Sequence, residues 1–239
     1  MLTIVCYKWN KPGRGVDFRR RRVVYTAEHV NNLSAMVSRH LTIPHRFLCF
    51  TDDPTGIKCE TQLIPAAHLL KYGGCWVRLW LFSKEACAIG EQVVSIDLDT
   101  VIVGSLAPLF AHSQSLAIWG NLYPKVCGPY CGSIWSLFTG SLPEVWEDFS
   151  ANNLRRFKLQ GNKYKHVDCN DWVGSDQCWI GVTVPDARVW TAEDGVLSYR
   201  LQARGELPSN ARIVNFHGCE DPSLSSCQRE SPWILDHWR

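Results

Sequence analysis

The chain has 239 residues, of which 46% are hydrophobic and eleven are tryptophan, enough for the core of one sizeable domain. Its formal net charge of +2 does not mark a dedicated nucleic-acid binder, so no nucleic-acid partner is expected. Residues 1–20 hold no apolar run long enough for a signal peptide, and no window approaches a membrane span. We therefore expect a cytoplasmic protein whose eleven cysteines are mostly buried free thiols.

The first fifty residues alternate between strand and helix signals. Leu2–Tyr7 is rich in β-formers and predicts a strand, followed by a loop that begins with Lys8 and Trp9. Thr26 is placed to cap a helix, and Arg46–Phe50 predicts the next strand. A strand, a helix and a strand in succession form a βαβ unit, which predicts an α/β fold with a parallel sheet.

The middle of the chain continues this pattern. Trp76–Ala88 has helical spacing, and Arg78 lies near its start. Because helix amino ends attract phosphate, Arg78 is a candidate contact for an anionic donor; a surface arginine is the equal alternative. Leu116–Trp119 and Ser133–Phe138 read as further strands, and a helix is expected to start at Pro143.

The most informative stretch is Val93–Val103, VVSIDLDTVIV, an apolar run that contains two aspartates. In an extended strand alternate side chains share a face, so Asp97 and Asp99 are expected to point the same way. Hard divalent cations such as Mg²⁺ and Mn²⁺ bind such oxygens and keep other positions for phosphate. The stretch predicts a metal site that holds a phosphorylated donor; the alternative is two solvated aspartates in a turn.

Two later motifs are expected to join the aspartates at one edge of the sheet. Asp176 and Gln177 stand at a predicted helix start, and His217 follows a predicted last strand, Arg212–Phe216. A metal bound by two carboxylates and an imidazole keeps open positions for a diphosphate, whose charge it neutralises as a Lewis acid. The alternative for His217 is a core or surface histidine. A further trio, His166, Asp168 and Asp171, is interpreted as solvated loop side chains rather than a second metal site.

These pieces occur in a definite order along almost the whole chain: IVCYKW, RHLTIPHRFLCFTDDPTGI, GGCWVRLWLF, VVSIDLDTVIVGSLAPLF, YCGSIW, GSDQCWI, RIVNFHG and PWILDHW. In this order the sequence resembles the nucleotide-sugar glycosyltransferases with the GT-A fold, and specifically bacterial and phage enzymes distantly similar to the family 8 group of glycogenin and galactosyltransferases. The resemblance implies one continuous domain with a Rossmann-like mixed central sheet flanked by helices. Residues 1–110 would form its nucleotide-sugar-binding half, and residues 111–239 its acceptor-binding half and C-terminal tail.

The resemblance also implies roles for individual residues. Asp97 and Asp99 match the metal-binding D-x-D motif, with Asp97 also reaching the ribose, and His217 is similar to the third ligand. In the glycogenin-like pattern that histidine stands where Asn215 is found here, so Asn215 is the fallback ligand. The other implied contacts are Lys8 and Trp9 with the base, Arg78 with the phosphates, Asp176 and Gln177 with the transferred sugar, and Gly132 and Ser133 with the acceptor or diphosphate.

Two departures from the pattern concern those last contacts. Cys131-Gly132-Ser133 replaces an expected Asn-containing piece, and Glu220-Asp221-Pro222 stands in place of the usual Lys-Pro after the histidine motif. The resemblance favours Mn²⁺ or Mg²⁺, a UDP-sugar donor and a retaining reaction, in which Asp176 or Gln177 stabilises positive charge on the sugar. In an inverting reaction Asp176 would be the base. The acceptor, whether glycan, lipid or protein, is not specified, and peripheral membrane contact is left open.

Two other functions remain as alternatives. Asp97-Leu98-Asp99-Thr100 resembles the D-x-D-x-T nucleophile motif of haloacid dehalogenase-type phosphatases, with Asp97 as nucleophile. That motif normally follows the first strand, whereas here several predicted elements precede it. The other alternative is a non-catalytic module that binds a nucleotide-sugar and does not transfer the sugar.

Overall fold

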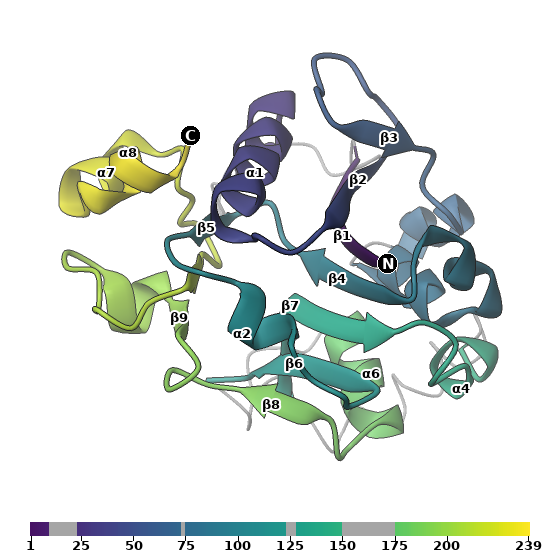
Figure 1. The fold of residues 1–239 in the computed structure, drawn as a ribbon. Helices are drawn as coiled ribbons and strands as arrows, with labels where there is room; N and C mark the ends of the chain where they lie inside the picture. Colours follow the sequence, from purple (N-terminus) through teal and green to yellow (C-terminus); the bar gives the residue numbers. More distant parts are fainter. Residues whose placement is uncertain (10–22, 73–74, 123–127, 150–174) are drawn as a thin grey trace. The chain divides into compact units, whose positions relative to one another are not determined.

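The computed structural model describes residues 1–9, 23–72, 75–122, 128–149 and 175–239. It has a mixed α/β fold with a central, mostly parallel sheet flanked by helices (Figure 1), which confirms the predicted fold class. Seven strands form this sheet in the order β3-β2-β1-β4-β7-β6-β8, and three form a second sheet in the order β5-β10-β9. His166, Asp168 and Asp171 lie outside the described residues.

The strands are β1 Leu2–Lys8, β2 His45–Thr51, β3 Glu60–Gln62, β4 Gln92–Ile96, β5 Thr100–Ile102, β6 Leu116–Gly120, β7 Tyr130–Phe138, β8 Arg188–Trp190, β9 Val196–Ser198 and β10 Ile213–Asn215. The α-helices are α1 Ala27–His40, α2 Ala107–Phe110, α4 Glu144–Glu147, α6 Asp176–Thr183, α7 Ser225–Glu230 and α8 Trp233–His237. Three 3₁₀ segments, η1 Ala67–Tyr72, η2 Trp76–Phe82 and η3 Lys84–Ile89, and one π-helix, η5 Tyr199–Ala203, complete the elements that bear on the site.

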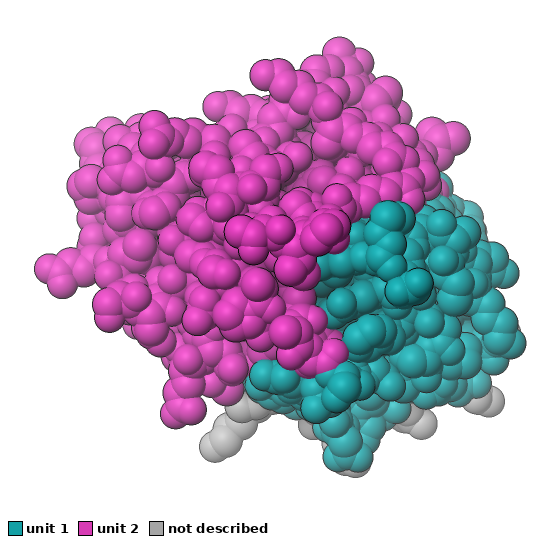
Figure 2. All heavy atoms as spheres, viewed as in Figure 1, with its two compact units in different colours: residues 1–3, 65–94, 113–189 teal, residues 4–64, 95–112, 190–239 magenta. Residues whose placement is uncertain are grey.

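The chain folds into two compact units, and each unit is made of segments that are separate in the sequence (Figure 2). Unit 1 comprises residues 1–3, 65–94 and 113–189, and unit 2 comprises residues 4–64, 95–112 and 190–239. These units are defined by compactness, and their boundaries differ from those of the predicted binding halves, residues 1–110 and 111–239. The functional assignment of those halves stays a prediction.

Helix α1 in unit 2 begins where the sequence predicts. Thr26 is its N-cap, and the backbone N–H of Thr26 donates to Nδ1 of His29 at 3.2 Å. This contact satisfies a donor at the helix start as a capping box does. Val30, Leu33, Met36 and Val37 form the fully buried stripe, and α1 packs on β5 through this apolar face.

Aromatic side chains dominate the core of unit 1. Trp76 stacks on Phe149 with ring centroids 5.2 Å apart, and Phe82 stacks on Trp135 at the same separation. The indole N–H of Trp179 donates to the carbonyl of Val145 at 2.8 Å, so α6 is tied to the start of α4. Large buried rings supply much apolar area per residue, which explains how short helices and 3₁₀ turns are held in place here.

The region predicted as one helix, residues 76–88, is helical but forms two 3₁₀ segments, η2 and η3, in place of one continuous helix. Ser83 lies between them in extended conformation, with φ −71° and ψ 161°, and interrupts the helical hydrogen-bond ladder. Trp76, Val77, Leu79, Leu81 and Phe82 are all buried, a pattern broader than one helical stripe. Packing on several sides therefore outweighs the α-helical periodicity read from the sequence.

Free cysteines occur throughout the described residues. Cys6, Cys49, Cys178 and Cys227 are buried, as expected, whereas Cys87 and Cys219 are exposed. Burial raises the pKa of Cys6 well above its ordinary value, which keeps this thiol protonated.

Candidate functional site

The two aspartates of the D-x-D motif lie between two strands rather than within one. β4 ends at Ile96 and β5 begins at Thr100, so the continuous strand expected over residues 93–103 is wrong. The chain leaves the seven-stranded sheet after β4, and β5 pairs antiparallel with β10 in the other sheet. Asp97 and Asp99 are half-buried in this connection, with fully buried apolar residues in the strands on both sides. Asp97 and Asp99 therefore lie where the chain passes from one sheet to the other, and not at alternate positions of one strand.

Negative charge is concentrated around this connection. The pKa of Asp99 is raised to about 8, first because the group is buried and second because of the negative charge of Asp97; Asp221 adds a smaller effect. A hydrogen bond between Tyr25 and Asp99 acts in the opposite direction. Burial, together with Asp99, Asp97 and Asp221, raises the pKa of Tyr25 well above its ordinary value. Three carboxylates around one tyrosine make a setting that a cation would stabilise.

The fallback ligand Asn215 and the predicted ligand His217 lie beside this connection. Asn215, the last residue of β10, is paired in register with Thr100, whose hydroxyl donates to Oδ1 of Asn215 at 3.1 Å. The next backbone N–H, that of Phe216, donates to the carbonyl of Asp99 at 2.9 Å. The structure thus brings Asp99, Asn215 and the start of the His217 turn together within unit 2, although these segments are more than a hundred residues apart in sequence.

His217 itself is half-buried and hydrogen-bonded. Its Nε2 lies 2.7 Å from Oγ of Ser198, the residue that caps the π-helix η5. Burial lowers the pKa of His217, the positive charge of Arg200 lowers it further, and Glu220 opposes the shift. The neutral imidazole, which is the form that binds metals, is therefore favoured. Within the described ranges, no group of three or more His, Cys, Asp or Glu side chains is arranged to hold a metal ion.

Lys8 is the last residue of β1 and Trp9 follows it, both in unit 2. The Lys8 side chain is buried, and its ammonium donates to the carbonyl of Asp53 at 3.2 Å and lies 3.8 Å from the Asp53 carboxylate. The Trp9 ring is half-buried and meets the Tyr7 ring edge-on, with centroids 6.5 Å apart. The turn after β2 thus holds Lys8, while Trp9 presents an aromatic surface next to it.

A second group of predicted residues meets in unit 1. Arg78, in η2, is buried and donates from Nε to Oδ2 of Asp176 at 2.7 Å; its Nη2 lies 2.6 Å from the same oxygen. Its Nη1 donates to the carbonyl of Gly132 at 2.8 Å. The backbone N–H of Gly132 in turn donates to Oε1 of Gln177 at 2.9 Å. Arg78, Gly132, Asp176 and Gln177, all selected from the sequence, therefore form one hydrogen-bonded cluster.

Local sequence explains why this cluster forms. Ser175 is the N-cap of α6, so Asp176 and Gln177 begin the helix as predicted. A Cβ atom at Gly132 would lie only 2.7 Å from Nη2 of Arg78, so only glycine allows the guanidinium to approach the backbone this closely. Burial raises the pKa of Asp176, and the charge of Arg78 opposes that shift. Ser133 is buried next to Gly132, and its hydroxyl lies 3.5 Å from the Cys131 thiol.

Sequence reasoning missed four residues of the unit 2 site: Tyr25, Ser198, Arg200 and Asp221. None belongs to a motif that points to metal or phosphate chemistry. Of the four, Asp221 could have been noticed in the sequence, because it belongs to Glu220-Asp221-Pro222, the segment that replaces the usual Lys-Pro after the histidine motif. It is buried and lies 3.3 Å from Nε2 of His29 in α1.

No protein-family model and no curated protein sequence matches this chain. Solved structures do match. The galactosyltransferase LgtC, solved in complex with donor and acceptor sugar analogs, aligns over 99% of this chain and 96% of its own, with 10% identity and a TM-score of 0.62. The chain has the GT-A fold.

Two larger proteins share the GT-A fold over part of their length. The glycosyltransferase GlyE of Streptococcus pneumoniae TIGR4 aligns over 99% of this chain with 10% identity and a TM-score of 0.60. The bifunctional glycosyltransferase WbbM aligns over 98% with 11% identity and a TM-score of 0.57. The aligned region spans 63% of the GlyE chain and 50% of the WbbM chain. At these identities the likeness establishes the GT-A fold and leaves the chemistry to the residues of this chain.

Proposed function

We propose that this protein is a metal-dependent glycosyltransferase that moves a sugar from a nucleotide-diphosphate donor, a UDP-sugar by preference, to an acceptor. The observation that carries the proposal is the Asp97–Asp99 pair in the connection between β4 and β5 of a GT-A fold, where β10 brings Asn215 and the His217 turn alongside. The structures with this fold include LgtC, which was solved with donor and acceptor sugar analogs. A retaining reaction is favoured.

The side chains at the β4–β5 connection are of the chemical types that bind a divalent cation. Carboxylate oxygens are the ligands that Mg²⁺ and Mn²⁺ prefer, and a neutral imidazole suits Mn²⁺. Asp97 and Asp99 are the proposed ligands, with His217 as third ligand and Asn215 as its alternative. When bound, the cation would supply neutralising charge for the diphosphate leaving group. Burial first, and then the negative charge of Asp97, raises the pKa of Asp99, and a bound cation would offset both effects.

The remaining roles fall on other residues of the chain. Lys8 and Trp9 are proposed to contact the base of the nucleotide. Trp9 offers an aromatic face on which a base stacks. Arg78 is proposed as a donor contact, and its two hydrogen bonds to Asp176 and Gly132 support a further role in positioning that carboxylate. Gly132 and Ser133 are proposed to line the same region, next to Gln177.

Asp176 and Gln177 are proposed to act on the transferred sugar. Arg78 holds the Asp176 carboxylate through two of its nitrogens, both on Oδ2, and this fixes the position of the carboxylate. The amide of Gln177 is oriented by the Gly132 N–H, which donates to its Oε1, and we propose that its NH₂ group donates to the sugar. One solved LgtC structure is that of an active-site glutamine-to-glutamate mutant, which makes Gln177→Glu an informative variant here.

A thermal-shift screen of UDP-, GDP-, ADP- and CMP-linked sugars, with and without Mn²⁺, tests the proposal. We expect stabilisation by one donor class that requires the metal, and its loss in Asp99→Asn. Asp236→Asn is the matched control, because Asp236 is an exposed aspartate of α8 in the same unit. No metal-dependent stabilisation by any donor would refute the proposal.

The same protein samples distinguish a glycosyltransferase from the two alternative functions, a phosphatase and a non-catalytic binding module. Release of phosphate from a model ester without nucleotide would favour the phosphatase, although here the D-x-D follows the fourth strand of the chain rather than the first. Metal-dependent binding without donor hydrolysis at long incubation would identify a non-catalytic module. Across the described residues, no helix is long and apolar enough to cross a membrane. A cytoplasmic location, with or without peripheral membrane contact, is part of the proposal.

A further inference from the structure

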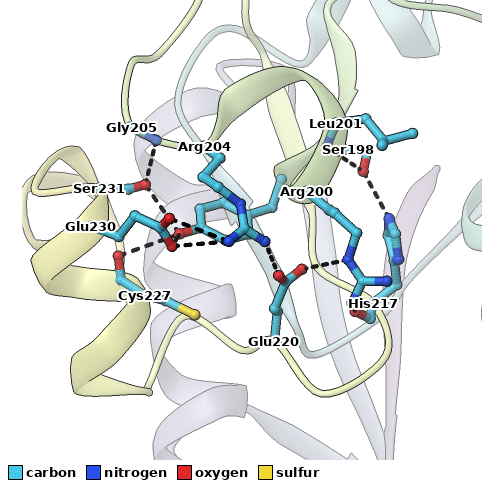
Figure 3. Close-up of polar contacts among 11 residues, drawn as sticks. Ser198, Arg200, Leu201, Arg204, Gly205, His217, Glu220, Cys227, Glu230 and Ser231 are labelled. Carbon is cyan, nitrogen blue, oxygen red and sulfur yellow. Dashed lines mark hydrogen bonds and ion pairs between the residues drawn. The ribbon is translucent and has the colours of Figure 1, made fainter.

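Two arginines converge on one glutamate beside the turn that carries His217 (Figure 3). Arg200 donates from Nε to Oε2 of Glu220 at 3.1 Å, and Arg204 pairs with the other oxygen of the same carboxylate. The Arg200 and Arg204 side chains are 38% and 39% exposed, and Glu220 is 14% exposed. Two guanidinium groups around one anion, close to solvent, form an arrangement that proteins also use to bind phosphate.

The two arginines differ in how firmly they are held. Arg204 also contacts both oxygens of Glu230 at 3.2 Å and lies over the Tyr199 ring, 5.4 Å from its centroid. Arg200 has two partners among the described residues, Glu220 and the carbonyl of His217, to which its Nη2 donates at 3.2 Å. Arg204 is thus anchored on three sides, whereas among the described residues Arg200 pairs with a single charged side chain, that of Glu220.

A glycine in the turn after His217 allows the Arg200 side chain to lie against the backbone. Gly218 has a φ of +82°, and a Cβ atom at this position would lie 2.8 Å from Nη2 of Arg200. On the other side, Ser198 connects the π-helix to the same turn, because its Oγ accepts from the Leu201 N–H at 3.4 Å and lies 2.7 Å from the His217 ring. Single π-helical turns are frequent at functional sites. Arg200 is therefore held next to the proposed metal ligand by both elements.

We infer that Arg200 binds the diphosphate of the donor, and that in the ligand-free protein Glu220 occupies this guanidinium and is displaced when the donor binds. The inference rests on the proposed function, because it uses His217 as the metal end of the site. A diphosphate carries more negative charge than one carboxylate and presents several oxygens to the guanidinium fork. The guanidinium of Arg200 can exchange Glu220 for a ligand because the Arg200 side chain is 38% exposed and therefore open to solvent. Arg204 remains to hold the released carboxylate.

Isothermal titration of the full chain with inorganic pyrophosphate, at constant Mg²⁺, tests this inference. Glu220→Gln removes the competing charge and is expected to tighten pyrophosphate binding about two- to fivefold. Arg200→Gln removes a charge-assisted hydrogen-bond donor and is expected to weaken binding about tenfold or more. Arg200→Lys keeps the charge without the fork and should fall between wild type and Arg200→Gln. Circular dichroism melts establish that each variant is folded.

A matched ion pair elsewhere in unit 2 provides the control. Arg46 and Glu60 pair on neighbouring strands β2 and β3, with the Arg46 Nε 2.6 Å from the Glu60 carboxylate. Glu60→Gln releases an arginine and changes the net charge just as Glu220→Gln does, so it should leave pyrophosphate affinity unchanged. An equal gain in both glutamate variants, or unchanged affinity in folded Arg200→Gln, overturns the inference.

The thermal-shift screen with nucleotide-sugars distinguishes a wrong role for Arg200 from a wrong proposed function. If a nucleotide-sugar stabilises the wild type in a metal-dependent way and Arg200→Gln equally well, the role of Arg200 is wrong while the function stands. If no nucleotide-sugar binds the wild type, the proposed function is wrong whatever Arg200 does with pyrophosphate.

Discussion

Replacing Gly132 with alanine should disrupt the buried ion pair of unit 1. The new Cβ would lie 2.7 Å from Nη2 of Arg78 and 3.5 Å from the Cβ and Oε1 of Gln177. Arg78 has little room to move, because it is buried and its Nη2 lies 2.6 Å from Oδ2 of Asp176. Either the backbone of β7 shifts or the guanidinium leaves its partners.

The expected cost follows from these two routes. Overpacking a buried site costs about 1–3 kcal/mol. Loss of one charge-assisted hydrogen bond to a buried group costs about 1.5–3 kcal/mol. By either route we therefore expect Gly132→Ala to lower the free energy of unfolding by about 1–3 kcal/mol, measured by urea denaturation followed by tryptophan fluorescence and circular dichroism.

A double-mutant cycle tests the reason for this loss. Arg78→Gln shortens the side chain that the new methyl group meets, so the double variant should be more stable than the sum of the two single losses predicts. The coupling should be at least about 1 kcal/mol for residues in direct contact. A loss below about 0.5 kcal/mol for Gly132→Ala, or strictly additive losses in the cycle, would refute the steric explanation.

Two further predictions concern unit 2. Gly218→Ala and Gly205→Ala each place a Cβ at positive φ, +82° and +80°, and should each cost about 1 kcal/mol of stability in urea denaturation. Only Gly218→Ala should also weaken pyrophosphate binding, because nothing lies within 4 Å of a Cβ at Gly205; equal effects on binding would contradict the role of Arg200. Burial is the main cause that lowers the pKa values of His40 and His237 in the folded protein. As the pH falls below about 6.5, these histidines therefore take up protons in the unfolded chain before they do so in the folded protein. The melting temperature should therefore fall below that pH, and His40→Gln should make the fall shallower; an unchanged slope would contradict this explanation.

Much of the fold was predictable because local patterns agree with the tertiary structure. The α1 helix carries its N-cap in sequence, and the structure places Thr26 there as expected. The same holds for β1 and for the start of α6 at Asp176. At these sites propensity, spacing and capping all favour one structure.

The break at the D-x-D motif has no comparable local signal. β5 leaves the central sheet because it pairs with β10, whose residues lie more than a hundred positions later in the chain. The same long-range pairing places Asn215 opposite Thr100 and brings Asp221 close enough to act on Tyr25 and Asp99. The sequence suggested which residues carry chemistry, whereas their partners depend on contacts that sequence spacing does not encode.

The central claim is that the connection between β4 and β5 binds a divalent cation on which a nucleotide donor depends. Titration of Mn²⁺ into the full chain, with free Mn²⁺ measured by electron paramagnetic resonance, tests it most directly. We expect one saturable site that Asp99→Asn weakens about tenfold or more and Asp236→Asn leaves unchanged, since Asp99 would supply a ligand directly. Absence of saturable binding in the wild type, or equal affinity in Asp99→Asn, would contradict it.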